Sequence, residues 1–113
     1  MAWYRDLVRN TVMPLIEKWE PILGVKVEQM NIRRMRTRWG SCTPSRRIIR
    51  LNSELAKKVP ECLEYVVVHE LTHLLEPSHN ARFISLMDQF MPHWHHIRDE
   101  LNRAPLGHVE WEY

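Results

Sequence analysis

The segment from residue 69 to residue 79 carries the side chains best suited to chemistry in this chain of 113 residues. His69, Glu70 and His73 form the pattern H-E-x-x-H, and His79 follows six residues after His73. Residues four apart share one face of an α-helix, so His69 and His73 can direct both imidazoles at one ion. Three imidazoles with one open coordination position are typical of a catalytic Zn²⁺, which lowers the pKa of a bound water towards neutrality. Glu70 is then the candidate general base.

The residues before this pattern favour a metal site over a chance match. Residues 63–68 are mostly apolar and predict a buried helix that continues into the motif. Two histidines and a glutamate on the buried side of a helix are costly unless hydrogen bonds or a ligand satisfy them. The alternative interpretation is a core helix whose histidines are hydrogen-bonded.

The third ligand has two rivals in the sequence. Glu76 lies three residues after His73 on nearly the same helix face, where a carboxylate binds an ion or orients a ligand histidine. A third ligand in line on a straight helix would overshoot an ion already held at four-residue spacing, so His79 is favoured. Glu100, on a later helix, is the other alternative.

Four blocks of the sequence form an ordered set of motifs. They read R-W-G-S-C at 38–42, R-L-N at 50–52, V-V-V-H-E-L-T-H at 66–73 and H-N-A-R-F at 79–83. Together they resemble the YgjP/SprT-like zinc metallopeptidases over about residues 30 to 101. The chain departs from the family pattern at Ser78, because relatives more often have Asn before the third histidine.

The resemblance implies a fold, an activity and a set of site residues. The fold would be α+β and zincin-like, with an N-terminal helix, a small three-stranded sheet, an active-site helix and C-terminal helices. The activity would be hydrolysis of peptide bonds in a protein or peptide substrate. The resemblance also implies zinc binding by His69, His73 and His79, with Glu70 as base.

The segment 38–42 resembles the edge strand along which an extended substrate pairs in these enzymes. Backbone pairing gives affinity without reading side chains, and a glycine lets another backbone approach closely. The candidate substrate-binding residues are therefore Trp39, Gly40, Ser41 and Cys42. The alternative is that Gly40 serves a turn or bulge and that Trp39 belongs to the core.

Basic residues are concentrated between Glu28 and Glu54, a window without any acidic residue. The net charge of the chain is only +2, so this is a local feature. It contains Arg33, Arg34, Arg36, Arg38, Arg46, Arg47 and Arg50. They are either solvated strand edges or a contact for nucleic acid or an acidic substrate. A second functional hypothesis is thus a nucleic-acid-associated binding module with a structural zinc, but such a site needs no base at Glu70.

The last ten residues, 104–113, suggest a device for latency. Val109, Trp111 and Tyr113 alternate as in a strand. The intervening residues His108, Glu110 and Glu112 each carry a group that binds zinc. Such a segment would inhibit the enzyme by pairing beside the substrate strand and occupying the open zinc position. The alternative is a tail that packs on the core or is frayed.

Composition predicts one domain spanning residues 1–113. The hydrophobic content of 44% is ordinary for a globular protein, and no apolar stretch approaches the roughly 20 residues that span a membrane. We therefore expect no membrane association. The two cysteines, Cys42 and Cys62, fit free thiols in a reducing cytoplasm. We expect a cytoplasmic monomer.

The apolar pattern and the turn residues predict where the elements lie. We expect a helix over 3–19, kinked at Pro14, with Pro21 marking its exit. Strands follow around 25–35, 36–42 and 46–51, and a short helix ends near 58. The active-site helix should run from Pro60 to Glu76. The next helix should have Ser78 as its N-cap and end before Pro92. A last helix over 93–102 should bury Trp94 and expose its neighbouring histidines.

Overall fold

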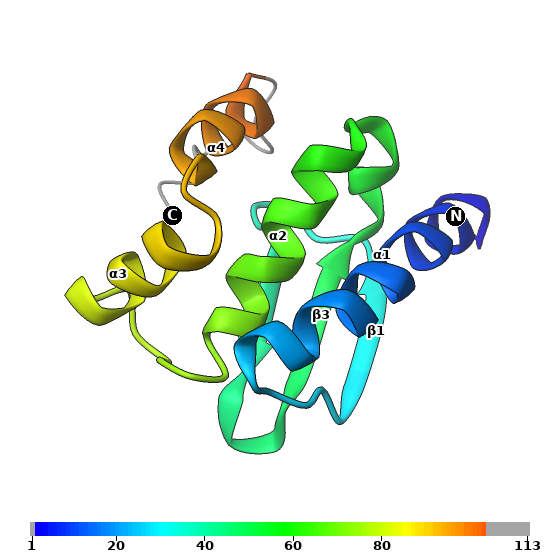
Figure 1. Ribbon diagram of the computed structural model, residues 1–113. Helices are drawn as coiled ribbons and strands as arrows, with labels where there is room; N and C mark the ends of the chain where they lie inside the picture. The colour runs from blue at the N-terminus through cyan, green and yellow to red at the C-terminus, as the bar shows by residue number, and fades with distance from the viewer. Residues whose placement is uncertain (1, 104–113) are drawn as a thin grey trace.

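A computed structural model describes residues 2–103 and shows four helices beside a three-stranded sheet (Figure 1). The helices are α1 (Ala2–Leu23), α2 (Pro60–Thr72), α3 (Ala81–Phe90) and α4 (Trp94–Asn102). The strands are β1 (Gln29–Arg33), β2 (Gly40–Thr43) and β3 (Ile48–Asn52). Two short 3₁₀ helices, η1 (Pro44–Arg46) and η2 (Ser53–Lys57), flank β3. The predicted α+β class is confirmed.

The sheet places β2 at an edge, because its strand order is β1-β3-β2. β1 runs parallel to β3, with Met30 opposite Ile49. β2 runs antiparallel to β3, with Gly40 opposite Leu51. The chain turns between β2 and β3 through η1 and Arg47, whose φ of 54° is left-handed. One side of β2 is thus left without a neighbouring strand among residues 2–103.

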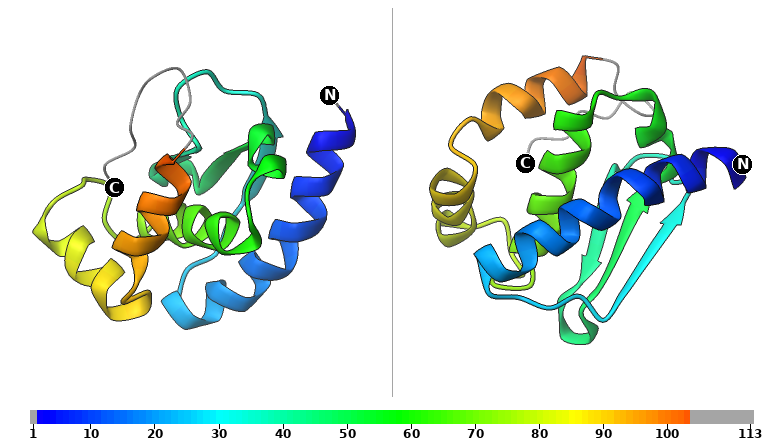
Figure 2. Two further views of the ribbon diagram at one scale, coloured as in Figure 1. Left: turned by 90° about the horizontal axis from the view of Figure 1, so that it is seen from above. Right: turned by 45° about the vertical axis from the view of Figure 1, so that its right-hand side comes forward.

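Helix α2 lies at the centre of the molecule. It packs against β2 and β3 on one side, against α1 on another, and against α3 and α4 on the side away from α1 (Figure 2). Its residues from Cys62 to Thr72 are buried with the exception of Glu64. A helix that is apolar on all sides belongs in the interior. Glu64 accepts hydrogen bonds from Trp19 Nε1 at 2.7 Å and Lys18 Nζ at 2.9 Å, which join α1 to α2.

Helix α1 is longer than predicted. It continues through Pro14 and Pro21 to Leu23, because Trp19 and Leu23 extend the buried stripe that begins at Val8. The helix ends where Gly24 adopts a φ of +71° and donates its N–H to the carbonyl of Glu20 at 2.9 Å. A left-handed glycine is a common helix terminus.

Helix α2 is shorter than predicted and ends at Thr72, not at Glu76. The amides of Leu74 and Leu75 bond to carbonyls three residues earlier, which tightens the chain out of the α-helix. The cap of α3 is Asn80, whose Oδ1 accepts the N–H of Phe83 at 3.0 Å; the predicted cap at Ser78 is wrong. Residues 73–80 are called the ligand loop below.

The second strand is also shorter than the predicted 36–42, and the first extends only to Arg33. The backbone between them is held by Asn52, which is fully buried. Asn52 Nδ2 donates to the carbonyls of Met35 at 2.8 Å and Arg38 at 2.7 Å. These carbonyls therefore bond to a side chain and not to a neighbouring strand.

Other expectations at this level are confirmed. Helix α4 spans Trp94–Asn102 with Trp94 in the core, while His93, His95 and His96 are exposed. Cys42 and Cys62 are free thiols. Within residues 2–103, every helix is too short or too polar to traverse a lipid bilayer. The predicted strand at the C-terminus lies outside the described residues.

Candidate metal centre

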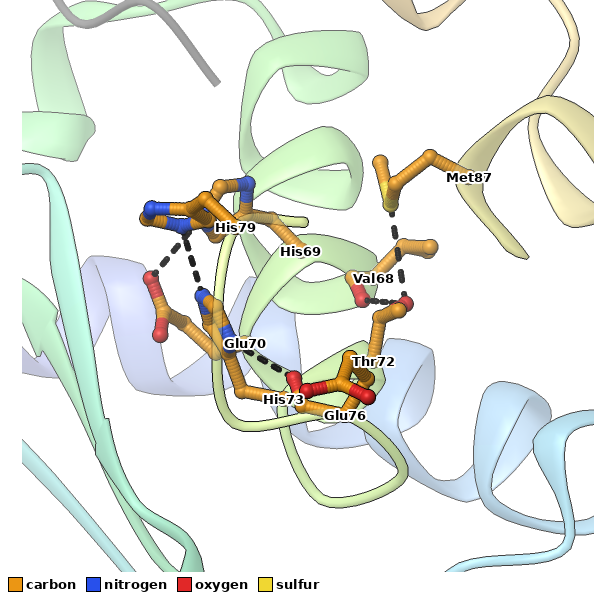
Figure 3. Close-up of polar contacts among 8 residues, drawn as sticks. All are labelled: Val68, His69, Glu70, Thr72, His73, Glu76, His79 and Met87. Carbon is orange, nitrogen blue, oxygen red and sulfur yellow. Dashed lines mark hydrogen bonds and ion pairs between the residues drawn. The ribbon is translucent and has the colours of Figure 1, made fainter. Parts of the chain in front are cut away.

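Helix α2 holds the H-E-x-x-H motif in the interior of the protein. His69, Glu70 and His73 have exposed fractions of 1%, 2% and 7%. Thr72 turns its hydroxyl away from them, donating to the carbonyl of Val68 at 2.7 Å (Figure 3). The two histidines lie one turn apart, as their spacing predicts.

The ligand loop brings His79 back to the same point. Its Nε2 lies 2.8 Å from Nε2 of His73 and 3.3 Å from Nε2 of His69 (Figure 3). Two nitrogens bound to zinc at 2.0–2.1 Å in a tetrahedron are about 3.3 Å apart. The distance to His69 matches this value, the distance to His73 is shorter, and all three ligand atoms lie within 4.8 Å of one another, so the group could hold a divalent metal; it is the one such group of three that residues 2–103 contain.

Burial keeps the three imidazoles in the form that binds a metal. It lowers the pKa of His69 well below the usual value, and the neighbouring His73 and His79 lower it further. The pKa values of His73 and His79 are also lowered, chiefly by burial. Neutral imidazoles have a nitrogen lone pair available at neutral pH. With Nδ1–H of His73 donated to the carbonyl of Glu76 at 3.1 Å, Nε2 remains the ligand atom.

Glu70 lies beside this donor set without being part of it. Its Oε2 is 4.0 Å from Nε2 of His69. Burial raises the pKa of Glu70 to about 8, and the positive charge of Arg38 opposes that rise. A divalent cation at the histidines would lower this pKa, because a nearby opposite charge favours the carboxylate. Glu70 is thus a carboxylate whose basicity is unusually high for its type.

Strand β2 approaches Glu70 closely at Gly40. A Cβ atom on Gly40 would lie 2.9 Å from Oε2 of Glu70 and 3.0 Å from Cγ1 of Val66, closer than atoms pack in proteins. Cys42 lies two residues further along the strand. Burial raises the pKa of its thiol to about 12, and the negative charge of Glu70 contributes to that rise. The edge strand and Glu70 therefore share one wall of the site.

The other predicted substrate-strand residues divide between the core and the edge. Trp39 is 3% exposed, with Lys58 Nζ 5.3 Å from its ring centroid, so its side chain packs in the core. Ser41 and Cys42 are half-buried on β2. Gly40 begins β2 and is itself buried, so Ser41 and Cys42 are the two of the four that are partly accessible on the edge strand.

The two rival ligands lie elsewhere. Glu76 Oε2 accepts the N–H of Ser78 at 3.1 Å, and its Oε1 lies 3.4 Å from Nη1 of Arg82. The same guanidinium donates to the carbonyl of Leu75 at 2.7 Å. Glu76 thus stabilises the ligand loop. Glu100 lies on α4 and lines a separate pocket with Val59.

Three arginines of the basic segment, Arg33, Arg47 and Arg50, lie at different places along the sheet. Arg33 lies at the end of β1 opposite Asn52, and Arg47 precedes β3 at the other end of the sheet. Arg47 pairs with Glu28 at 3.7 Å, and Arg50 donates to the hydroxyl of Thr43 at 3.0 Å. Contact with nucleic acid through this segment stays a prediction.

Two residues near the site were not singled out from the sequence. Asn52 fixes the backbone that leads to β2. A polar residue at the end of the apolar strand β3 is the feature of the sequence that could have indicated this role. Phe83 lies against all three imidazoles. It ends the motif at 79–83, but nothing in the sequence shows what its ring contacts.

Comparisons with known proteins agree with this geometry. A family model described as the YgjP-like metallopeptidase domain matches residues 1–104. The fold is similar to the crystal structure of the metallopeptidase zymogen abylysin of Pyrococcus abyssi, at 23% identity and a TM-score of 0.72, covering 80% of this chain and 90% of that one.

A second similar fold is the metallopeptidase zymogen jannalysin of Methanocaldococcus jannaschii, at 19% identity and a TM-score of 0.57, covering 87% of this chain and 92% of that one. A comparison with curated proteins finds no match. Because the family model spans nearly the whole sequence, this chain belongs to the YgjP-like metallopeptidase family.

Proposed function

We propose that the protein is a zinc-dependent endopeptidase in which His69, His73 and His79 hold the metal and Glu70 is the general base. Membership of a metallopeptidase family implies a divalent metal and a protein or peptide substrate. The observation that carries the proposal is the convergence of three imidazoles beside the buried carboxylate of Glu70, whose Oε2 lies 4.0 Å from Nε2 of His69. A structural site would need the ligands but not this carboxylate.

When bound, zinc supplies a Lewis acid that polarises the peptide carbonyl and acidifies water. Glu70 then takes a proton from the attacking water and delivers it to the leaving amine. The substrate lies extended along β2 and pairs with the backbone of Gly40 to Cys42. The contact between Gly40 and Glu70 supports this arrangement, because it brings the strand beside the base.

Glu70→Gln tests the proposal. The variant should retain zinc and lose roughly 10²- to 10⁴-fold in rate, the range typical of a general base. Glu61→Gln is a matched control, since it removes an exposed carboxylate from the first turn of the same helix. Metal content and peptidase rate on an unstructured protein are measured for both. Equal activity in wild type and Glu70→Gln would exclude the enzyme mechanism.

We further propose that the full chain is latent and that its C-terminal tail inhibits it. The similar structures abylysin and jannalysin are both described as zymogens, which supports this second proposal. The candidate groups are His108, Glu110 and Glu112, which lie outside the described residues. Truncation after Asn102 should raise activity on an unstructured protein. A folded, zinc-loaded truncation without that rise would reject latency.

A further inference from the structure

The aromatic ring of Phe83 contacts all three candidate ligands. Phe83, which is 1% exposed, has its ring centroid 4.5 Å from that of His73 and 5.0 Å from those of His69 and His79. It stacks on His73 at an interplanar angle of 26°. It meets His69 and His79 edge to face, at 68° and 80°. The ring thus forms an apolar floor beneath the donor set.

The position of Phe83 is set by the same segment that carries His79. Its N–H donates to Oδ1 of Asn80, the residue after His79, at 3.0 Å. One turn further along α3, Met87 is fully buried and contacts the hydroxyl of Thr72 at 3.5 Å. Helix α3 therefore docks on α2 through two buried side chains, of which Phe83 touches the histidines and Met87 touches Thr72.

The ring of Phe83 adds a packing restraint to the hydrogen bonds that orient the imidazoles. The bond from Nδ1 of His73 to the carbonyl of Glu76 fixes one edge of that ring. A stacked neighbour fixes the plane, because the ring cannot turn about its Cβ–Cγ bond without colliding with Phe83. Residues that orient ligands set metal affinity, and the apolar shell around a site controls the access of water.

We propose that Phe83 is a positioning residue of the metal centre: its ring holds the three imidazoles so that their Nε2 atoms converge before an ion arrives. The inference rests on the proposed ligand role of His69, His73 and His79. It adds a residue that touches neither the metal nor the substrate and that sets how tightly the metal binds.

Phe83→Leu tests the inference, with Met87→Ala as the matched control on the same buried face of α3. Zinc and cobalt affinity are measured by competition with a chelator, and urea unfolding of the metal-free proteins reports the stability of the fold. Phe83→Leu should lower the affinity about 10- to 100-fold, as substitutions of ligand-orienting residues do. Its cobalt absorption spectrum should change as well. Met87→Ala should lower stability but keep the affinity and spectrum of the wild type.

Two outcomes would overturn the inference. One is wild-type affinity and an unchanged cobalt spectrum in Phe83→Leu. The other is an equal loss of affinity in both variants, which would show that only the docking of α3 matters. Phe83→Met, a flexible side chain without a ring, repeats the test if Phe83→Leu does not fold. Failure of the wild type itself to bind one zinc would instead contradict the proposed function.

Discussion

At the scale of single residues, the contact between Gly40 and Glu70 couples the edge strand to the proposed base. Gly40→Ala would place a Cβ 2.9 Å from Oε2 of Glu70, so β2 or the carboxylate must shift. A displacement of about 1 Å in a catalytic group costs on the order of 10²-fold in rate. We expect that loss in kcat/KM with zinc content unchanged. Asn31→Ala, on β1, is the control, and an equal rate in Gly40→Ala and wild type would contradict the coupling.

The third ligand gives a second prediction at this scale. His79 is the exposed member of the donor set, so His79→Ala should lower zinc affinity steeply and leave the fold largely intact. Metal analysis and circular dichroism measure the two effects. Glu76→Ala serves as the comparison, because it removes the rival carboxylate and keeps the backbone carbonyl that accepts Nδ1–H of His73. Full zinc in His79→Ala together with its loss in Glu76→Ala would reverse the assignment.

At the scale of elements, Asn52 determines where β2 can begin. It donates to two carbonyls of the preceding loop, and its Oδ1 accepts the N–H of Glu54 at 2.9 Å. Each buried polar group left without a partner costs about 1–3 kcal/mol. We therefore expect Asn52→Ala to lower the free energy of unfolding by about 2–4 kcal/mol in urea titrations. Asn31→Ala, on a partly exposed position of β1, should change it by less than about 0.5 kcal/mol.

The sequence predicted those elements that are determined by residues close together in the chain. Pro60 opens α2, and the apolar run after it predicted a buried helix because burial and periodicity act within a few residues. The end of α1 was missed because Leu23, buried by tertiary packing, outweighs the helix-breaking tendency of Pro21. Propensity is a weak prior against such packing.

In the candidate site too, the features set by local sequence were predicted and the features set by tertiary packing were not. The spacing of His69 and His73 predicted their shared face, since the geometry of one helix decides it. The cap at Asn80 in place of Ser78 follows from how the ligand loop folds back over α2. The ring contacts of Phe83 depend on how α3 docks, which no spacing in the sequence encodes. Contacts between elements are therefore what the sequence left unpredicted.

At the scale of the whole molecule, the buried site makes stability depend on pH when no metal is bound. The pKa values of the three histidines are lowered from 6.5, so their contribution to stability is present above pH 6.5 and is lost as the pH falls. The pKa of Glu70 is raised from 4.5 to about 8, so its contribution is present below pH 4.5 and is lost as the pH rises through about 8.

The histidines make the free energy of unfolding rise with pH, and Glu70 makes it fall. Together they predict that the metal-free protein is most stable near pH 6.5 and less stable on both sides. Urea unfolding in the presence of a chelator, repeated across this range, measures the curve. Glu70→Gln should abolish the decline on the alkaline side and keep the one on the acid side. A decline above neutrality that persists in Glu70→Gln would show that another group causes it.

The candidate ligands lie partly on the buried helix α2 and partly on the ligand loop. We expect this arrangement to determine how fast a bound ion is exchanged. His69 lies inside α2 and His73 caps that helix, both buried, whereas His79 is exposed at the far end of the loop and should leave first when the loop opens. We therefore expect the rate of release to be limited by loop opening, which breaks the bond between His79 and the metal. Zinc loss should reach a plateau at high chelator concentration. The plateau should rise in Arg82→Ala, which removes the bond to the carbonyl of Leu75.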